Sequence, residues 1–388
     1  MKHISRTIWI LSLVSLFTDM ASEMLYPVMP VYLESIGFSV LLIGVLEGLA
    51  ETTAGLSKGY FGNWSDRAGK RLPFVQIGYG LSAVSKPLLA LFVFPLWVFF
   101  ARTLDRLGKG IRTGARDALL SAETTPETKG RVFGFHRALD TLGAVLGPCL
   151  ALLYLYRYPE DYRSLFLLAF IPGMLAIGST MLIRERKPAA RQTKTRPGIF
   201  DFVQYWKTSG PTYRQLVGAL LLFALFNSSD IFLLLQAKAI GLSDSAVIGV
   251  YIFYNLIFAV AALPMGILAD KAGMRWVFTG GLLLFALVYL GMAFARTPIA
   301  VYGLFFLYGL YAAATEGVGK AWITNICKKE DTATAIGTYT GFQSICAFMA
   351  SSLTGLVWYV WGAPVAFLLS AAVAIGVGGY LLISKNLH

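Results

Sequence analysis

The chain is poor in the residues that soluble enzymes and metalloproteins depend on. It has three cysteines and three histidines in 388 residues, and only 14% of its residues are charged. A soluble domain of this size would carry about 25% charged residues. Cys149, Cys327 and Cys346 lack metal-ligand or redox spacing. With so few soft ligands we predict no metal site and no cofactor.

Motifs for catalysis and nucleotide hydrolysis are also missing. His3, His136 and His388 do not lie in an H-x-x-x-D or H-E-x-x-H pattern. No G-x-x-x-x-G-K-[ST] loop is present, which argues against direct ATP hydrolysis. We therefore predict that the chain is not an enzyme. A polytopic membrane enzyme, such as a lipid-modifying transferase, is the alternative from another functional class.

Long apolar runs dominate the sequence instead. Hydrophobic residues make up 56% of the chain, and the mean hydropathy is +0.65. Runs of about 20 residues suffice to cross a bilayer core as helices, and the alternation typical of barrels is absent. We predict an all-α integral membrane protein with twelve spans, at about 8–34, 40–62, 72–93, 95–115, 132–156, 164–184, 214–236, 245–269, 275–295, 299–322, 334–358 and 363–384.

The net charge of +12 is distributed over alternate loops, which favours membrane topology over nucleic-acid binding. The opposite loops hold only Arg157, Arg163, Lys238 and Arg296. By the positive-inside rule, the basic loops and both termini are expected in the cytoplasm. The lack of long extramembrane domains suits a bacterial inner membrane. The basic loop set comprises the basic cluster of the segment between Arg184 and Arg214, together with Arg67, Lys70, Arg71, Arg112, Arg116, Lys129, Arg131, Lys271, Arg275, Lys328 and Lys329.

One polar motif occurs twice. GNWSDRAGKR begins at Gly62 and GILADKAGMR begins at Gly266, 204 residues later, and both read G-x-x-x-D-[R/K]-x-G-x-R. A basic, proline-containing segment lies between the copies. This duplication predicts two pseudo-symmetric six-helix bundles. We place them at 1–185 and 214–388, joined by a cytoplasmic linker at 186–213.

The motif has a definite chemistry. Asp66 and Asp270 are expected to accept N–H groups at a helix N-terminus. Gly69 and Gly273 permit a tight turn. A loop that served only as a basic topology signal would need neither the aspartate nor the glycine at fixed spacing.

These two motifs, after spans two and eight, resemble the signature loop of the major facilitator superfamily. The resemblance implies secondary transport by a monomer, with spans one, four, seven and ten around a central cavity. It also implies a cytoplasmic latch formed by Gly62, Asp66, Arg67, Gly69, Arg71, Gly266, Asp270, Gly273 and Arg275. GAVLGP in span five, with Gly143, Gly147 and Pro148, resembles the core of a helix-packing motif associated with antiporters.

Several ionisable residues fall inside the predicted spans, where each is a functional hypothesis by default. Spacings of three and four place those of spans one, two and four on single helix faces. Pairing of the carboxylates of spans one and two with the span-four arginines, as structural bridges inside the first half, is the alternative. The predicted substrate and proton cavity comprises Asp19, Glu23, Glu47, Glu51, Arg102, Asp105, Arg106, Lys109, Asn227, Asp230 and Glu316.

These features predict alternating-access transport of a small solute through the bilayer. Our first hypothesis is proton-coupled efflux of a small organic or amphiphilic compound, with Asp19 or Glu23 carrying the proton. One alternative is an organic anion bound by Arg102, Arg106 and Lys109. Another is a metal cation bound by the acidic cluster. No nucleic acid is expected as a partner.

Overall fold

The computed structural model describes residues 4–26, 28–29, 32–33, 36–37, 40–185, 198 and 201–384. Helices account for all regular structure in these residues, so the all-α prediction is confirmed. The contacts define two compact units. Unit 1 is Met1–Thr124, Leu139–Thr208 and Cys327–Gly341, and unit 2 is Thr125–Ala138, Ser209–Ile326 and Phe342–His388.

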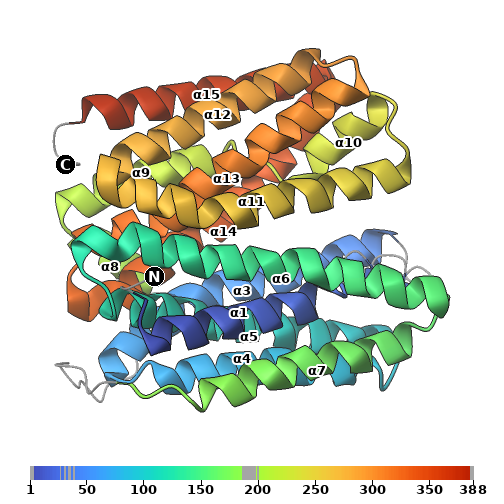
Figure 1. The fold of residues 1–388 in the computed structure, drawn as a ribbon, viewed down its shortest axis with the longest axis horizontal. Coiled ribbons are helices and arrows are strands. Elements are labelled where there is room, and N and C mark those ends of the chain that lie inside the picture. Colours follow the sequence, from blue (N-terminus) through green and yellow to red (C-terminus); the bar gives the residue numbers. More distant parts are fainter. Residues whose placement is uncertain are drawn as a thin grey trace. The chain divides into compact units, whose positions relative to one another are not determined.

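Unit 1 is a bundle in which α4 packs against both α5 and α7 (Figure 1). Helix α1 also packs on α7, and α3 packs on α5. Two helices, α6 and α14, each contribute only one part to this unit. The helices are α1 (Arg6–Glu23), α3 (Val40–Ala68), α4 (Leu72–Leu89), α5 (Pro95–Ala122), α6 (Lys129–Arg157), α7 (Tyr162–Thr180), α8 (Asp201–Thr208) and the short η2 (Lys329–Asp331).

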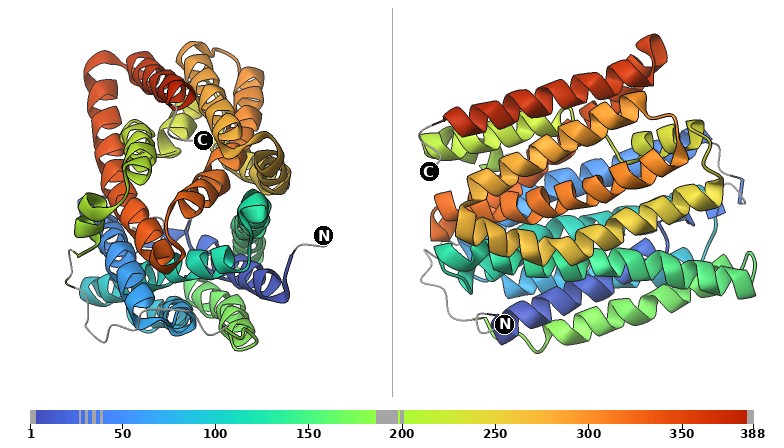
Figure 2. Two further views of the ribbon diagram at one scale, coloured as in Figure 1. Left: turned by 90° about the vertical axis from the view of Figure 1, so that its left-hand side faces the viewer. Right: turned by 45° about the horizontal axis from the view of Figure 1, so that its top comes forward.

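In unit 2, α12 packs against both α13 and α15. The views of Figure 2 show α15, in red, running alongside α12. Helix α11 packs on α13. The helices are η1 (Pro126–Thr128), α9 (Pro211–Ala224), α10 (Ile231–Ala239), α11 (Asp244–Ala272), α12 (Met274–Phe294), α13 (Pro298–Ile326), α14 (Thr332–Trp361) and α15 (Ala363–Ile383).

Spans one and seven are each interrupted within their predicted bounds. Helix α1 ends at Glu23, and a turn follows at 24–26. Pro27 has no N–H to donate to the carbonyl four residues earlier. In span seven, α9 ends at Ala224 and α10 begins at Ile231. The residues between include N-S-S-D at 227–230, whose side chains compete with helical backbone hydrogen bonds.

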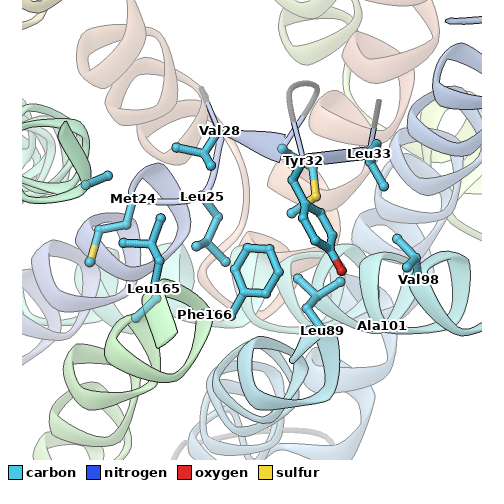
Figure 3. Close-up of a cluster of buried hydrophobic side chains, with 13 residues drawn as sticks. Met24, Leu25, Val28, Tyr32, Leu33, Leu89, Val98, Ala101, Leu165 and Phe166 are labelled. Atoms are coloured by element: carbon cyan, nitrogen blue, oxygen red, sulfur yellow. The ribbon is translucent and has the colours of Figure 1, made fainter. Parts of the chain in front are cut away.

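An apolar cluster fixes the chain after the first interruption (Figure 3). Met24, Leu25 and Leu33 are almost fully buried against residues from α4, α5 and α7. Tyr32 meets the ring of Phe166 edge-on, with centroids 4.8 Å apart. Burial of these side chains anchors the interruption at a defined place in unit 1.

Helix α5 extends beyond the predicted end of span four, from Pro95 to Ala122. Its 28 residues correspond to about 42 Å at 1.5 Å per residue, longer than a bilayer core. Arg112 and Arg116 are therefore helical and buried, with exposed fractions of 5% and 8%. Their assignment to a basic loop was wrong.

Of the helices that the structure describes, seven are long and apolar enough to cross a membrane by length and composition alone. Helix α5 fails that test because it carries a row of charged residues. The predicted linker contains α8, and α9 begins at Pro211. Residues 186–197 of that linker lie outside the described residues.

Candidate functional site

The first motif copy caps the beginning of α14 within unit 1. Asp66 Oδ2 accepts hydrogen bonds from the Thr334 backbone N–H at 2.7 Å and from its hydroxyl at 2.9 Å. Asp66 Oδ1 pairs with the Arg71 guanidinium at 3.0 Å, and Arg71 also donates to the Lys329 carbonyl. The carboxylate therefore stabilises the positive end of a helix and an arginine together.

Burial sets the protonation chemistry of Asp66, which lies beyond the apolar stretch that ends at Gly62. Desolvation raises the pKa of this carboxyl to about 6, while Arg71 and the bonds from Thr334 act in the opposite direction. Desolvation dominates because its side chain is only 5% exposed.

The second copy does the same for α6 within unit 2. Asp270 Oδ1 accepts from the Gly130 N–H at 2.7 Å, and Oδ2 accepts from the Arg131 N–H at 2.8 Å. The expected backbone hydrogen bonds are thus present for both motif aspartates. Arg275 of this copy donates to the carbonyl of Leu382.

Motif glycines serve close approach and turn formation. A Cβ on Gly62 would lie 2.5 Å from the Ala333 carbonyl oxygen, so α3 contacts the start of α14 backbone to backbone. Gly266 approaches the Gly130 carbonyl in the same way. Gly69 and Gly273 have φ of +61° and +96°, which favours glycine at both turns.

Glu185 is a capping residue that the sequence analysis missed. Its Oε1 accepts from the Arg71 N–H at 2.8 Å, and its Oε2 accepts from the Leu72 N–H at 3.0 Å. The residue that follows span six therefore caps α4, next to the first motif. A lone glutamate in a basic segment gives no sequence signal for this role.

Lys86 and Asp105 form a buried ion pair in unit 1. The Lys86 Nζ lies 2.8 Å from Asp105 Oδ1 and also donates to the Ser22 hydroxyl at 3.2 Å. Asp105 therefore has a basic partner on α4. Arg102 and Lys109 lie on the same face of α5 as Asp105. Arg102 is buried and Lys109 is exposed.

Glu23 occupies the last position of α1, where the first interruption begins. Its Oε2 is buried and accepts no hydrogen bond from any residue that the structure describes. The charges of Lys109, Arg106 and Lys86 act on this carboxylate from a distance. Asp19 lies one turn earlier on the same helix.

For Glu47 and Glu51 the structure describes the backbone but not the side chain. Both positions belong to α3. Their side chains lie outside the described residues, so their predicted place in the cavity stays a prediction.

A second basic cluster, which sequence reasoning missed, lies closer to the C-terminal end of α5. Arg116 pairs with Asp117 at 2.8 Å and donates to the Ser15 hydroxyl at 3.1 Å. Arg112 lies over the Tyr79 ring, 4.5 Å from its centroid. The sequence signal was present, because these arginines continue the three-and-four spacing of the stripe that begins at Arg102.

In unit 2, Asp230 is the last residue of the interruption of span seven, directly before α10. Its Oδ1 accepts the Tyr308 hydroxyl at 2.6 Å, and its Oδ2 accepts the Tyr254 hydroxyl. Asn227 donates to the Tyr311 hydroxyl at 3.0 Å. Glu316 is paired with Arg137. The two tyrosine partners of Asp230 were not predicted.

Gly143 and Gly147, the predicted packing glycines of α6, face α1 within unit 1. A Cβ on Gly147 would lie 2.6 Å from the Met20 carbonyl oxygen, and a Cβ on Gly143 would lie still closer to the Leu16 carbonyl oxygen. Pro148 lies inside the same helix. In the part of the chain that the structure describes, no three His, Cys, Asp or Glu side chains are placed to hold a metal ion.

Duplicated caps, interrupted helices and buried charges define a membrane transporter built from two related halves. The sequence matches the Major Facilitator Superfamily over residues 11–253 and 216–386, and the chain belongs to this superfamily. It is a twelve-span transporter with two six-helix halves, and not an enzyme.

Relatives and solved structures agree with this assignment. An MFS-type transporter of Methanocaldococcus jannaschii is 32% identical over 389 residues, covering 98% of this chain and 95% of the relative. The multidrug resistance protein MdtG of Dickeya zeae is 25% identical over 78% of this chain and 76% of its own.

Two crystal structures share the fold at low identity. The human organic anion transporter MFSD10 superposes with a TM-score of 0.83 at 15% identity, covering 97% of this chain and 99% of its own. The transporter FucP, in its outward conformation, gives 0.79 at 12% identity, covering 98% and 99%.

Proposed function

We propose that this protein is a proton-coupled secondary transporter of a small organic solute, with Glu23 carrying the proton. The supporting observation is the buried Glu23 Oε2, which has no hydrogen-bond donor among the described residues. A carboxylate without a fixed partner inside a bundle can exchange a proton, whereas Asp105 is committed to Lys86. Asp19, one turn away, is the second carboxylate on the same helix.

Efflux from the cytoplasm is the direction we propose. The relative MdtG is described as a multidrug resistance protein. The close packing of Gly143 and Gly147 on α1 fits the antiporter-associated motif. We place the protein in a bacterial inner membrane as a monomer. Both termini and both motif loops lie in the cytoplasm in this proposal, and the Asp66 and Asp270 caps form the cytoplasmic latch.

Transport of an organic anion is the second candidate. The buried Arg112 and Arg116 favour it, and one structural neighbour, MFSD10, is an organic anion transporter. Arg116, however, is already neutralised by Asp117 at 2.8 Å. Arg112 contacts the Tyr79 ring and the Ser82 hydroxyl, which leaves its positive charge for an anionic ligand.

Proton movement in proteoliposomes tests the proposal. Vesicles loaded with a pH-sensitive dye are given a panel of organic cations and anions, and internal pH is recorded for the wild type, Glu23→Gln and Asp19→Asn. We expect solute-induced proton movement in the wild type and its loss in Glu23→Gln. Unchanged coupling in both variants would refute proton transfer by α1. Proton movement driven only by anions and lost in Arg112→Gln would favour the second candidate.

A further inference from the structure

Asp230 is a carboxylate without a cationic partner inside unit 2. Both of its hydrogen-bond donors are tyrosine hydroxyls, and no basic side chain among the described residues lies within ion-pair distance. The N-terminus of α10, which follows directly, supplies only about half a positive charge. A negative charge at this depth therefore remains largely uncompensated.

The other charges of this region do not supply the missing cation. Arg137 pairs with Glu316 and lies over the Phe258 ring, so its charge is already balanced. Asp230 itself is partly exposed. A carboxylate has about four acceptor positions, of which the two tyrosines use two.

The tyrosines hold Asp230 in a fixed position. Tyr254 and Tyr308 are 5% and 4% exposed, and their rings meet at 63° with centroids 5.3 Å apart. Tyr308 also packs against Tyr311 at 5.3 Å. Both hydroxyls are thus directed toward Asp230 by rigid, buried rings.

Asn227 provides a second, independent indication of a ligand. Its amide nitrogen donates to Tyr311, but its Oδ1 is buried and accepts no hydrogen bond from any described residue. A buried acceptor that is left without a donor is energetically costly. The interruption therefore offers unused acceptors from Asn227 and Asp230, while the hydroxyls of Tyr254 and Tyr308 already donate to Asp230.

We infer that the interruption of the seventh span, between Asn227 and Asp230, is a binding site for a protonated organic amine. The ammonium group contacts Asp230 and donates N–H to Asn227 Oδ1, with Tyr254 and Tyr308 as positioning residues. This inference rests on the proposed transport function and specifies its solute class. The unused acceptors of Asn227 and Asp230 favour a cation over an anion here.

Calorimetric titration of the purified full-length chain tests the site without a proton gradient. The probe is 4-phenylbutylammonium, and 4-phenylbutan-1-ol is the uncharged ligand of matched size. We expect saturable binding of the amine and at least about tenfold weaker binding of the alcohol, since a hydrogen bond to a charged group contributes about 1.5–3 kcal/mol.

Variants separate the carboxylate from its supports. Asp230→Asn should weaken amine binding at least about tenfold and leave the alcohol unaffected. Tyr254→Phe, which keeps the ring, should weaken amine binding less. The matched control is Asp161→Asn, because Asp161 also accepts a tyrosine hydroxyl, from Tyr154, but lies between α6 and α7. It should bind like the wild type.

Two results would overturn the inference: no saturable amine binding by the wild type, or equal binding by wild type and Asp230→Asn. Size-exclusion profiles and alcohol binding show whether Asp230→Asn is folded, and Tyr254→Phe tests the site again if it is not. If the wild type binds the amine but moves no protons in proteoliposomes, the proposed proton coupling is refuted and the amine site stands. If the wild type couples solute to protons but binds no amine, the amine site is refuted and the proposed coupling stands.

Discussion

Lys86 and Asp105 show how a buried charge is tolerated in unit 1. Their side chains are 3% and 11% exposed and meet at 2.8 Å. A buried pair of this kind often adds little stability relative to an apolar pair, but removal of one member leaves an uncompensated charge. The Ser22 hydroxyl is too weak a partner to replace the carboxylate.

Removing one member of this pair should therefore destabilise the protein strongly, whereas replacing both members with apolar residues should not. We expect Asp105→Asn to lower the free energy of unfolding by about 3–5 kcal/mol, and Lys86→Met with Asp105→Leu to recover most of that loss. Unfolding of the purified protein, followed by intrinsic fluorescence, measures both. A double variant as unstable as the single one would contradict this view of the pair.

Asp66 makes stability depend on pH in a defined direction. Its pKa is raised from 3.8 to about 6, so the folded protein favours the protonated acid. The corresponding stabilisation is complete below about pH 4 and is lost as pH rises through 6, with a size of roughly 3 kcal/mol. We expect the wild-type melting temperature to fall, relative to that of Asp66→Asn, between pH 5 and pH 7.5. Parallel pH profiles of the two proteins would disprove this.

At the scale of single elements, the contact of α6 with α1 depends on small residues. Gly147 approaches Met20 so closely that an added Cβ would lie 2.6 Å from the Met20 carbonyl oxygen and 2.8 Å from the Met24 nitrogen. Both atoms belong to backbone, so neither can rotate away. Packing between these two helices therefore admits no side chain at this position.

Gly147→Ala should separate the two helices and destabilise the protein by about 1–3 kcal/mol. The matched control is Gly80→Ala in α4, where an added Cβ meets nothing within 4 Å. Because alanine favours helix over glycine, this control should be neutral or gain up to about 1 kcal/mol. Melting temperatures of the two variants decide, and equal values would contradict the packing argument.

Features that depend on neighbouring residues in the sequence could be predicted, and features that depend on distant residues could not. The caps formed by Asp66 and Asp270 could be predicted, because an aspartate at fixed spacing after an apolar run is a sequence signal. The buried position of Arg116 could not, because a rule of about 20 residues per span ends the helix too early. The partners of Asp230 come from α11 and α13, and no local pattern places Tyr254 and Tyr308 opposite it.

At the scale of the whole molecule, duplication produced similar frameworks with different interiors. Each half has an interrupted first helix and a serine–tyrosine contact at 3.3 Å, Ser15 with Tyr79 and Ser228 with Tyr289. The carboxylates at the interruptions differ in their surroundings. Glu23 Oε2 is buried without a hydrogen-bond donor among the described residues, whereas Asp230 accepts two tyrosine hydroxyls. Under the proposed function, this difference assigns proton exchange to Glu23 and solute binding to Asp230.

A division of labour between these carboxylates predicts different transport defects. Solute exchange at equal pH on both sides requires binding and alternating access but no net proton movement. We expect Glu23→Gln to retain counterflow of radiolabelled 4-phenylbutylammonium in proteoliposomes while losing accumulation driven by a pH gradient. Asp230→Asn should lose both, because its solute no longer binds. If Glu23→Gln abolished counterflow as completely as Asp230→Asn does, Glu23 would be part of the solute site and the separation of roles would fail.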